Sequence, residues 1–297
     1  AQVISGAVNP VDGGHVSLKA GDNIVGQQNI VDKTGDTTGV AGTPTAQYWW
    51  QWLETNNTAN RSAINFGAFD QGVMSAGGNV NVEAGGDIRQ LSVSLPTTWR
   101  LDGPSSAQVL TTFGGGDLSV RAGGDILSGS FFVAKGQGDI QAGGRIGSDF
   151  TLPYRRPDGS MYDQPISTLI AMQDAQLAVV ANGAITLGGI FNPSWMNISA
   201  VNAISPAGHA DGQAYGVDSR IDVTALGGDL TYGDLVSTPW LFTPGLQGSS
   251  STNDTAGDLL PATVNFTSLT GNLNLLTSGE LVPSTDGNLG LLAQQSV

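Results

Sequence analysis

A short sequence unit recurs along the chain, and it limits the fold more than any other feature. Residues 77–88 read GGNVNVEAGGDI and residues 115–126 read GGDLSVRAGGDI. Further copies, some of them weaker, lie at residues 13–24, 138–146, 177–185, 221–230, 264–273 and 289–297. Because so short a unit cannot bury its apolar face alone, we expect the copies to stack on one another.

Apolar and polar residues alternate within each clear copy. Val80, Val82 and Ala84 are separated by polar residues, so the period is two and the segment is predicted to be a strand with one buried face. Antiparallel hairpins would need about two residues between their strands, and the copies lie much farther apart. The strands are therefore expected to stack in parallel, with one inward-facing aliphatic row that contains Val82, Val120, Ile140 and Val223.

The clearest copies place a glycine step and a polar residue after the strand. We expect Gly85-Gly86 and Gly123-Gly124 to turn a corner with positive φ, which glycine reaches without steric cost. Asp87, the next residue of its copy, is expected to hydrogen-bond its own backbone just after the turn. Turn chemistry of this kind accounts for the large excess of Asp over Glu in the sequence.

The spacing of the copies allows two interpretations. The alanine that closes each strand, replaced once by Ser268, recurs at separations of 64, 38, 20, 39, 44, 43 and 25 residues. Most separations are near multiples of a coil of about 20 residues; alternatively, eight coils carry insertions between them. Either interpretation predicts an all-β fold, a right-handed parallel β-helix (solenoid) with loop insertions that forms one domain over 1–297, because parallel connections are almost always right-handed. The two short stretches that could form helices are 46–54 and 168–176.

Three segments between copies differ in composition and are expected to leave the solenoid as insertions: 27–75, 147–166 and 237–261. The first contains an aromatic run, which could stack on sugar rings or cover an open face of the solenoid. The second contains a turn-rich loop with a basic doublet. Together these two insertions supply the candidate ligand or partner contacts: Tyr48, Trp49, Trp50, Trp52, Tyr154, Arg155 and Arg156.

Polysaccharide cleavage on a β-helix would need paired carboxylates, or a carboxylate-bound cation with a basic group. The residues that could supply such chemistry are Asp158, Asp163 and Asp174 together with Arg155 and Arg156. An exposed loop explains the same residues without chemistry, so no catalytic residue is expected.

The remaining residue types exclude several classes of site and partner. Lys and Arg number 11 against 25 Asp and Glu, a net charge of −14, so nucleic-acid binding is not expected. No apolar run reaches the length of about 20 residues that a transmembrane helix needs. The absence of Cys excludes disulfides and thiolate metal sites.

Histidine and glycine patterns give no sign of a metal or cofactor. His15 and His209 lie far apart in sequence, which argues against zinc or a catalytic triad. His15 takes the place that Asn79 and Asp117 fill in other copies, so it is expected to be a polar corner residue. Residues 114–117 lack the spacing of a calcium-binding β-helix repeat.

The runs GGNVNVEAGGDI, GGDLSVRAGGDILSG and GDIQAGGRIGS resemble the filamentous haemagglutinin family of large bacterial exoproteins of two-partner secretion. The resemblance is specific in 77–147, moderate in 13–24 and 177–230, and faint beyond. It implies a β-helical shaft, export through a dedicated outer-membrane transporter, and a role in adhesion or toxin presentation. The family's amino-terminal secretion domain and a toxin module are not recognisable in this sequence.

The leading functional expectation is a non-catalytic shaft segment of a secreted, cell-surface bacterial adhesin or exoprotein. Its partners would be a receptor or glycan on a host or neighbouring cell. The alternatives are a polysaccharide-binding or polysaccharide-cleaving β-helix and the shaft of a contact-dependent toxin carrier. Residues 289–297 are apolar and uncharged, so a strand there would leave a bare edge. We therefore expect that the native chain continues past Val297 with more coils, or that this piece associates end to end.

Overall fold

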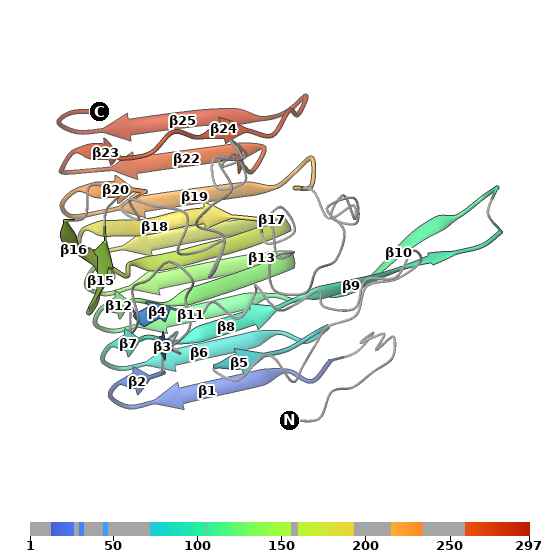
Figure 1. Cartoon of the computed structure of the whole chain (residues 1–297), viewed down its shortest axis with the longest axis horizontal. Coiled ribbons are helices and arrows are strands. Elements are labelled where there is room, and N and C mark those ends of the chain that lie inside the picture. Colours follow the sequence, from blue (N-terminus) through green and yellow to red (C-terminus); the bar gives the residue numbers. More distant parts are fainter. Residues whose placement is uncertain are drawn as a thin grey trace.

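The computed structural model describes residues 13–26, 30–32, 44–46, 72–104, 106–155, 160–192, 215–233 and 259–297. These residues are all-β, and 17 of their strands form one nearly closed, mostly parallel sheet (Figure 1). They contain no helix, and hence none long and apolar enough to cross a membrane.

The repeated units form one parallel stack, which we call the main stack (Figure 1). Each strand pairs with the next along the chain, residue for residue, as predicted from the alternation. The prediction of parallel stacking is thus confirmed. In order, the strands are β1 (Val16–Ala20), β6 (Val80–Ala84), β11 (Leu118–Ala122), β13 (Ser130–Ala142), β17 (Thr168–Ala181), β19 (Arg220–Ala225), β22 (Thr263–Ser268) and β25 (Asn288–Ala293).

Direct pairing decides between the two interpretations of the spacing. Val16 pairs with Val80 across the longest gap between copies, and Leu118 pairs with Val80 on its other side. Leu118 also pairs with Gly138, across the shortest gap. The interpretation of the longer gaps as multiples of one short coil is therefore wrong, and the copies are neighbouring rungs. We use rung for one strand of the main stack with the corner that follows it.

After each corner except the one that follows β25, the chain enters a second parallel stack. This second stack consists of β2 (Ile24–Val25), β7 (Ile88–Arg89), β12 (Ile126–Leu127), β14 (Ile146–Gly147), β18 (Ile185–Phe191), β20 (Leu230–Tyr232) and β23 (Leu273–Leu275).

A third set of short parallel pairs involves the first parts of β13 and β17 and the end of β18. It also includes β5 (Val73–Met74), β8 (Ser92–Leu95), β21 (Leu259–Leu260) and β24 (Glu280–Leu281).

The core lies between the stacks and is aliphatic. The predicted inward row is confirmed, because Val82, Val120, Ile140 and Val223 are all 0 % exposed and lie in register. The stretch 168–176, which could have formed a helix, belongs instead to β17. Its first residues, from Thr168 to Gln173, are buried on both faces, and a continuous apolar run of this kind suits a covered parallel strand. Of 46–54, only Ala46 is described, at the end of β4 (Pro44–Ala46).

The corner glycines serve a different purpose from the one expected. Gly85, Gly86, Gly123 and Gly124 do not have positive φ. Instead, a Cβ added to Gly123 would overlap the carbonyl oxygen of Gly85, and a Cβ on Gly143 would overlap that of Gly123. On the rungs of Gly85, Gly123 and Gly143 the backbones therefore approach so closely that this conformation of the corner leaves no room for a Cβ. On later rungs Asn182 and Leu226 fill the same slot.

Antiparallel hairpins leave the main sheet at two points in the described chain. Strands β9 (Thr97–Asp102) and β10 (Val109–Gly114) form one that projects away from the stack (Figure 1), and the sequence did not predict it. Strands β15 (Thr151–Arg155) and β16 (Met161–Pro165) form the other, within the expected insertion 147–166. A third antiparallel pair, β3 (Ile30–Asp32) with β4, lies within 27–75, most of which is outside the described residues, as is 237–258.

Two residues that follow the second stack carry backbone strain. Gln90 has φ of 51° and Ser128 has φ of 53°. Because Arg89 pairs with Leu127, the two occupy the same place on neighbouring rungs. An L-residue in this left-handed region costs about 1–2 kcal/mol that glycine avoids.

We expect Gln90→Gly to be more stable than Gln90→Ala by about 1 kcal/mol, because both lose the side chain and only glycine relieves the strain. Urea unfolding of the two variants, followed by circular dichroism, measures the difference. Equal stabilities would contradict the assigned backbone conformation.

Candidate functional site

The sequence-predicted contact residues fall largely outside the described chain. Tyr48, Trp49, Trp50, Trp52 and Arg156 all do so. Tyr154 and Arg155 lie on β15, where they pair with Tyr162 and Met161 of β16. The structure therefore places this pair on a hairpin and leaves their role as ligand or partner contacts a prediction.

The carboxylates proposed for polysaccharide cleavage are placed in part. Asp158 lies outside the described residues. Asp163 is exposed on β16, and Asp174 is exposed on β17. The Asp174 carboxylate lies 3.9 Å from Lys135 Nζ, on the neighbouring strand of the main stack. Asp174 is thus engaged in an ion pair between rungs.

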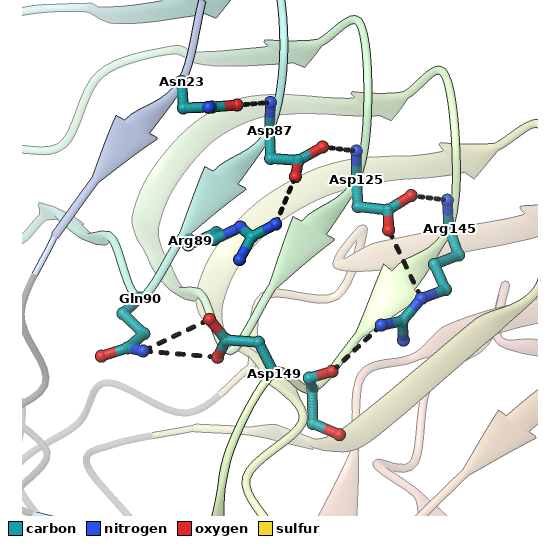
Figure 2. Close-up of polar contacts among 8 residues, drawn as sticks. Asn23, Asp87, Arg89, Gln90, Asp125, Arg145 and Asp149 are labelled. Carbon is teal, nitrogen blue, oxygen red and sulfur yellow. Dashed lines mark hydrogen bonds and ion pairs between the residues drawn. The ribbon is translucent and has the colours of Figure 1, made fainter.

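A ladder of side-chain acceptors runs along the glycine corner (Figure 2). Asn23 Oδ1 accepts the backbone N–H of Asp87 at 2.7 Å. Asp87 Oδ1 accepts the N–H of Asp125 at 2.8 Å, and Asp125 Oδ1 accepts the N–H of Arg145 at 2.8 Å. We call this the corner ladder. The expectation that Asp87 bonds its own backbone is wrong, because its carboxylate points along the stack to the next rung.

A second ladder, the strand-start ladder, precedes the main-stack strands. His15 Nδ1 accepts the N–H of Asn79 at 3.0 Å. Asn79 Oδ1 accepts the N–H of Asp117, and Asp117 Oδ1 accepts the N–H of Gln137, each at 3.0 Å. His15 is therefore a polar residue in the slot predicted for it, and it acts as a hydrogen-bond acceptor.

Cations complete the corner ladder (Figure 2). Arg89 Nη2 donates to Asp87 Oδ2 at 2.7 Å, and Arg145 Nε lies 3.4 Å from Asp125 Oδ2. The N–H of Asp125 and then the Arg89 guanidinium lower the pKa of the Asp87 carboxyl. Asp87 therefore stays ionised at neutral pH and serves as a fixed acceptor.

The pKa of Asp87 gives a pH-dependent prediction. A lowered folded-state pKa stabilises the fold above the ordinary carboxyl pKa of about 3.9, and this stabilisation is lost as pH falls through the folded-state pKa. Asp87→Asn keeps an acceptor without the charge, so it should lower the free energy of unfolding by about 1 kcal/mol at pH 7. The deficit should shrink between about pH 5 and pH 2. Urea unfolding across this range measures it, with Asp286→Asn, in an exposed turn, as the control. A deficit that does not change with pH would contradict the prediction.

An open groove of about 530 Å³ lies on the outer face of β11, β13, β17 and β19. The lining includes the small residue Ala178, which the strand register places between Asp139 and Asp222. Sequence reasoning missed this groove, since Ala178 lies in a weak copy and its neighbours come from other rungs. The residues around it are Asp117, Leu118, Gln137, Gly138, Asp139, Gln176, Leu177, Ala178, Arg220 and Asp222.

The two carboxylates that flank Ala178 are held by donors. Asp139 accepts from Arg121 Nη2 at 2.7 Å. Asp222 accepts from Arg220 Nε and from Asn265 Nδ2, each at 2.7 Å.

Asp222 does not have the environment of a general acid. Burial pushes the pKa of Asp222 upwards, but the hydrogen bonds from Arg220 and Asn265 outweigh it and leave the pKa below its usual value. The backbones of Asp139 and Asp222 lie two rungs apart, about 10 Å at the usual strand spacing. A general acid at neutral pH needs a raised pKa, so the groove suits binding better than acid catalysis.

Within the described ranges, no group of three or more His, Asp or Glu residues is arranged to hold a metal ion. Comparison with family models, with curated proteins and with solved structures gave no match.

Proposed function

We propose that the chain is a right-handed parallel β-helix and that it serves as a non-catalytic structural shaft segment of a secreted bacterial surface protein of the filamentous haemagglutinin type. The observation that carries the proposal is the pair of ladders. In each, a side chain of one rung accepts the backbone N–H of the next. Right-handed winding is supported by the parallel pairing of successive rungs, because crossover connections between parallel strands are almost always right-handed.

The charged side chains of the main stack support a structural role. Lys19 Nζ lies 2.7 Å from Glu83 Oε2, and Arg121 Nη2 lies 2.7 Å from Asp139 Oδ2. Both pairs join neighbouring rungs. Exposed pairs of this kind contribute only about 0–1 kcal/mol each, so they favour the correct register more than they add to stability. Glu83 and Asp139 thus act between rungs.

The projecting hairpin fits a shaft that presents contacts to other cells. Strands β9 and β10 extend away from the stack (Figure 1). Val109 on β10 is 64 % exposed. A receptor or glycan on a host or neighbouring cell would meet such excursions first. Export would require an outer-membrane transporter, as in two-partner secretion.

Immunolabelling of intact producing cells tests the proposed location. Antibody raised against the chain should label cells without permeabilisation. Labelling that appears only after permeabilisation would overturn the surface role.

A reducing-end assay on acidic and neutral polysaccharides tests the non-catalytic assignment. We expect no sugar release above a protein-free blank, because the groove carboxylates are held by donors and the pKa of Asp222 is lowered. Release by the wild-type chain that Asp139→Asn or Asp222→Asn abolishes would identify a glycan-cleaving enzyme instead.

Polysaccharide binding is the second candidate, and the groove around Ala178 favours it. The groove offers amide, guanidinium and carboxylate groups at successive rungs, which suits a hydroxyl-rich ligand. A glycan array probed with the wild-type chain and with Arg220→Ala tests it. Binding that the variant loses would support this candidate, and no binding to any glycan would exclude it.

A further inference from the structure

Exposed apolar side chains gather at one end of the stack. Eleven large hydrophobic residues of the described chain are exposed, and seven of them lie between 269 and 297. Figure 1 shows β25 as the last strand of the stack, with the C-terminus beside it. Concentrated apolar exposure of this kind usually marks an interaction site. The seven residues are Leu269, Leu275, Leu276, Leu289, Leu291, Leu292 and Val297.

Two of these residues continue the inward row of the core. Leu289 pairs with Val264, and Leu291 pairs with Phe266. Val264 and Phe266 are 0 % and 2 % exposed, whereas Leu289 and Leu291 are 52 % and 37 % exposed. The row is therefore exposed on β25, although it is buried on the neighbouring strand.

The opposite end of the stack leaves the same row partly exposed. Val16, Leu18 and Ala20 of β1 are only partly buried, although they pair with the fully buried Val80 and Val82. The repeat unit at this end, residues 13–24, keeps both the alternation of apolar and polar residues and the glycine after the strand.

The positions that carry the ladder side chains on other rungs are also polar at the β25 end. Asn288 precedes the inward row there, as His15 and Asn79 do on other rungs. Ser296 fills the corner slot, because its carbonyl accepts the N–H of Leu273 at 2.8 Å. In the same way the carbonyl of Asp125 accepts the N–H of Ile88 on an earlier rung. Both side chains contain an oxygen that can accept the N–H of a following rung.

We propose that the β25 edge of one copy docks the β1 edge of a second copy, in parallel and in the register of the repeat. Leu289 would then lie beside Val16, Leu291 beside Leu18, and Ala293 beside Ala20 of the partner copy. Lys19 would lie beside the uncharged Leu292, so no like charges meet.

Such a contact joins two different surfaces and does not close on itself, so it extends into linear assemblies and not only dimers. It depends on the strand pairing alone and would survive the failure of the proposed surface role.

Sedimentation velocity of the 297-residue chain over a hundredfold concentration range provides the first test. We expect species larger than the monomer that grow with concentration. A chain that stays monomeric throughout would overturn the proposal.

Two single-face variants provide the second test. Leu18→Lys should block the β1 face and Leu291→Lys the β25 face, so each alone should be monomeric. Each variant keeps the face that the other lacks, so an equimolar mixture should form dimers and stop there. Circular dichroism confirms that both variants are folded, and Val217→Lys, an exposed valine between the ends, should assemble like the wild type. Dimers of Leu18→Lys alone would overturn the proposal, since the β25 face would then pair with itself.

Discussion

Replacing Val120 by Asp should abolish folding. Val120 is 0 % exposed and lies between Val82 and Ile140 in the inward row. An unpaired carboxylate buried among aliphatic side chains costs several kcal/mol, and this is comparable with the whole stability of a domain, about 5–15 kcal/mol. We expect the purified variant to lack the β-type circular dichroism spectrum and the cooperative thermal transition of the wild type.

Val217→Asp is the matched control. It introduces the same residue at a valine that is 71 % exposed, so its thermal transition should stay within a few degrees of the wild type. A soluble Val120→Asp chain with an unchanged spectrum would place Val120 outside the core and contradict the assignment of the inward row.

The second large effect is expected at the glycine corner. In Gly123→Ala, the new Cβ would overlap the carbonyl oxygen of Gly85 on the neighbouring rung. Because the obstacle is backbone, the rungs must separate locally, and we expect a loss of about 3 kcal/mol or more in the free energy of unfolding.

Gly21→Ala controls for the intrinsic cost of alanine at this corner. Gly21 fills the same slot on the first rung, and a Cβ there would meet no atom within 4 Å. The variant should unfold at nearly the wild-type urea concentration. Equal losses in the two variants would mean that local conformation, and not the approach of the rungs, requires glycine here.

The sequence was most informative about single rungs. The alternation around Val82 and Val120 predicted both the strand and its buried face, since a period of two is a local property. The alignment of Ala20, Ala84 and Ala122 also predicted the register, because identical units stack most readily residue on residue.

Contacts between rungs could not be read from one copy alone. The carboxylate of Asp87 meets the N–H of Asp125, and Gly123 meets Gly85, in each case on a neighbouring rung. Local reasoning assigned Asp87 to its own turn and the glycines to positive φ. Both assignments failed because the nearest polar group or obstacle belongs to another rung.

The lengths of the insertions and the position of the groove could not be predicted either, because both depend on how different rungs pair. The long gap between Val16 and Val80 fits three coils as well as one rung with an excursion, and only pairing decides. The groove exists because Ala178 is small between Asp139 and Asp222, and these three residues come from three strands. The hairpin β9–β10 gave no repeat signal, since its strands pair outside the stack.

The direct pairing of the first two copies, despite the long gap between them, is the claim on which the proposed shaft rests. Disulfide formation tests it in a chain that has no Cys of its own. Ser17 pairs with Asn81, and Asn81 pairs with Ser119 on its other side. Neighbouring rungs lie about 4.8 Å apart, within the Cα separation of a disulfide, whereas two rungs span about 10 Å. Ser17→Cys with Asn81→Cys should therefore oxidise within one molecule, and Ser17→Cys with Ser119→Cys should keep its thiols. Free thiols in the first variant, or a disulfide in the folded second variant, would contradict the stacking of these copies as neighbouring rungs.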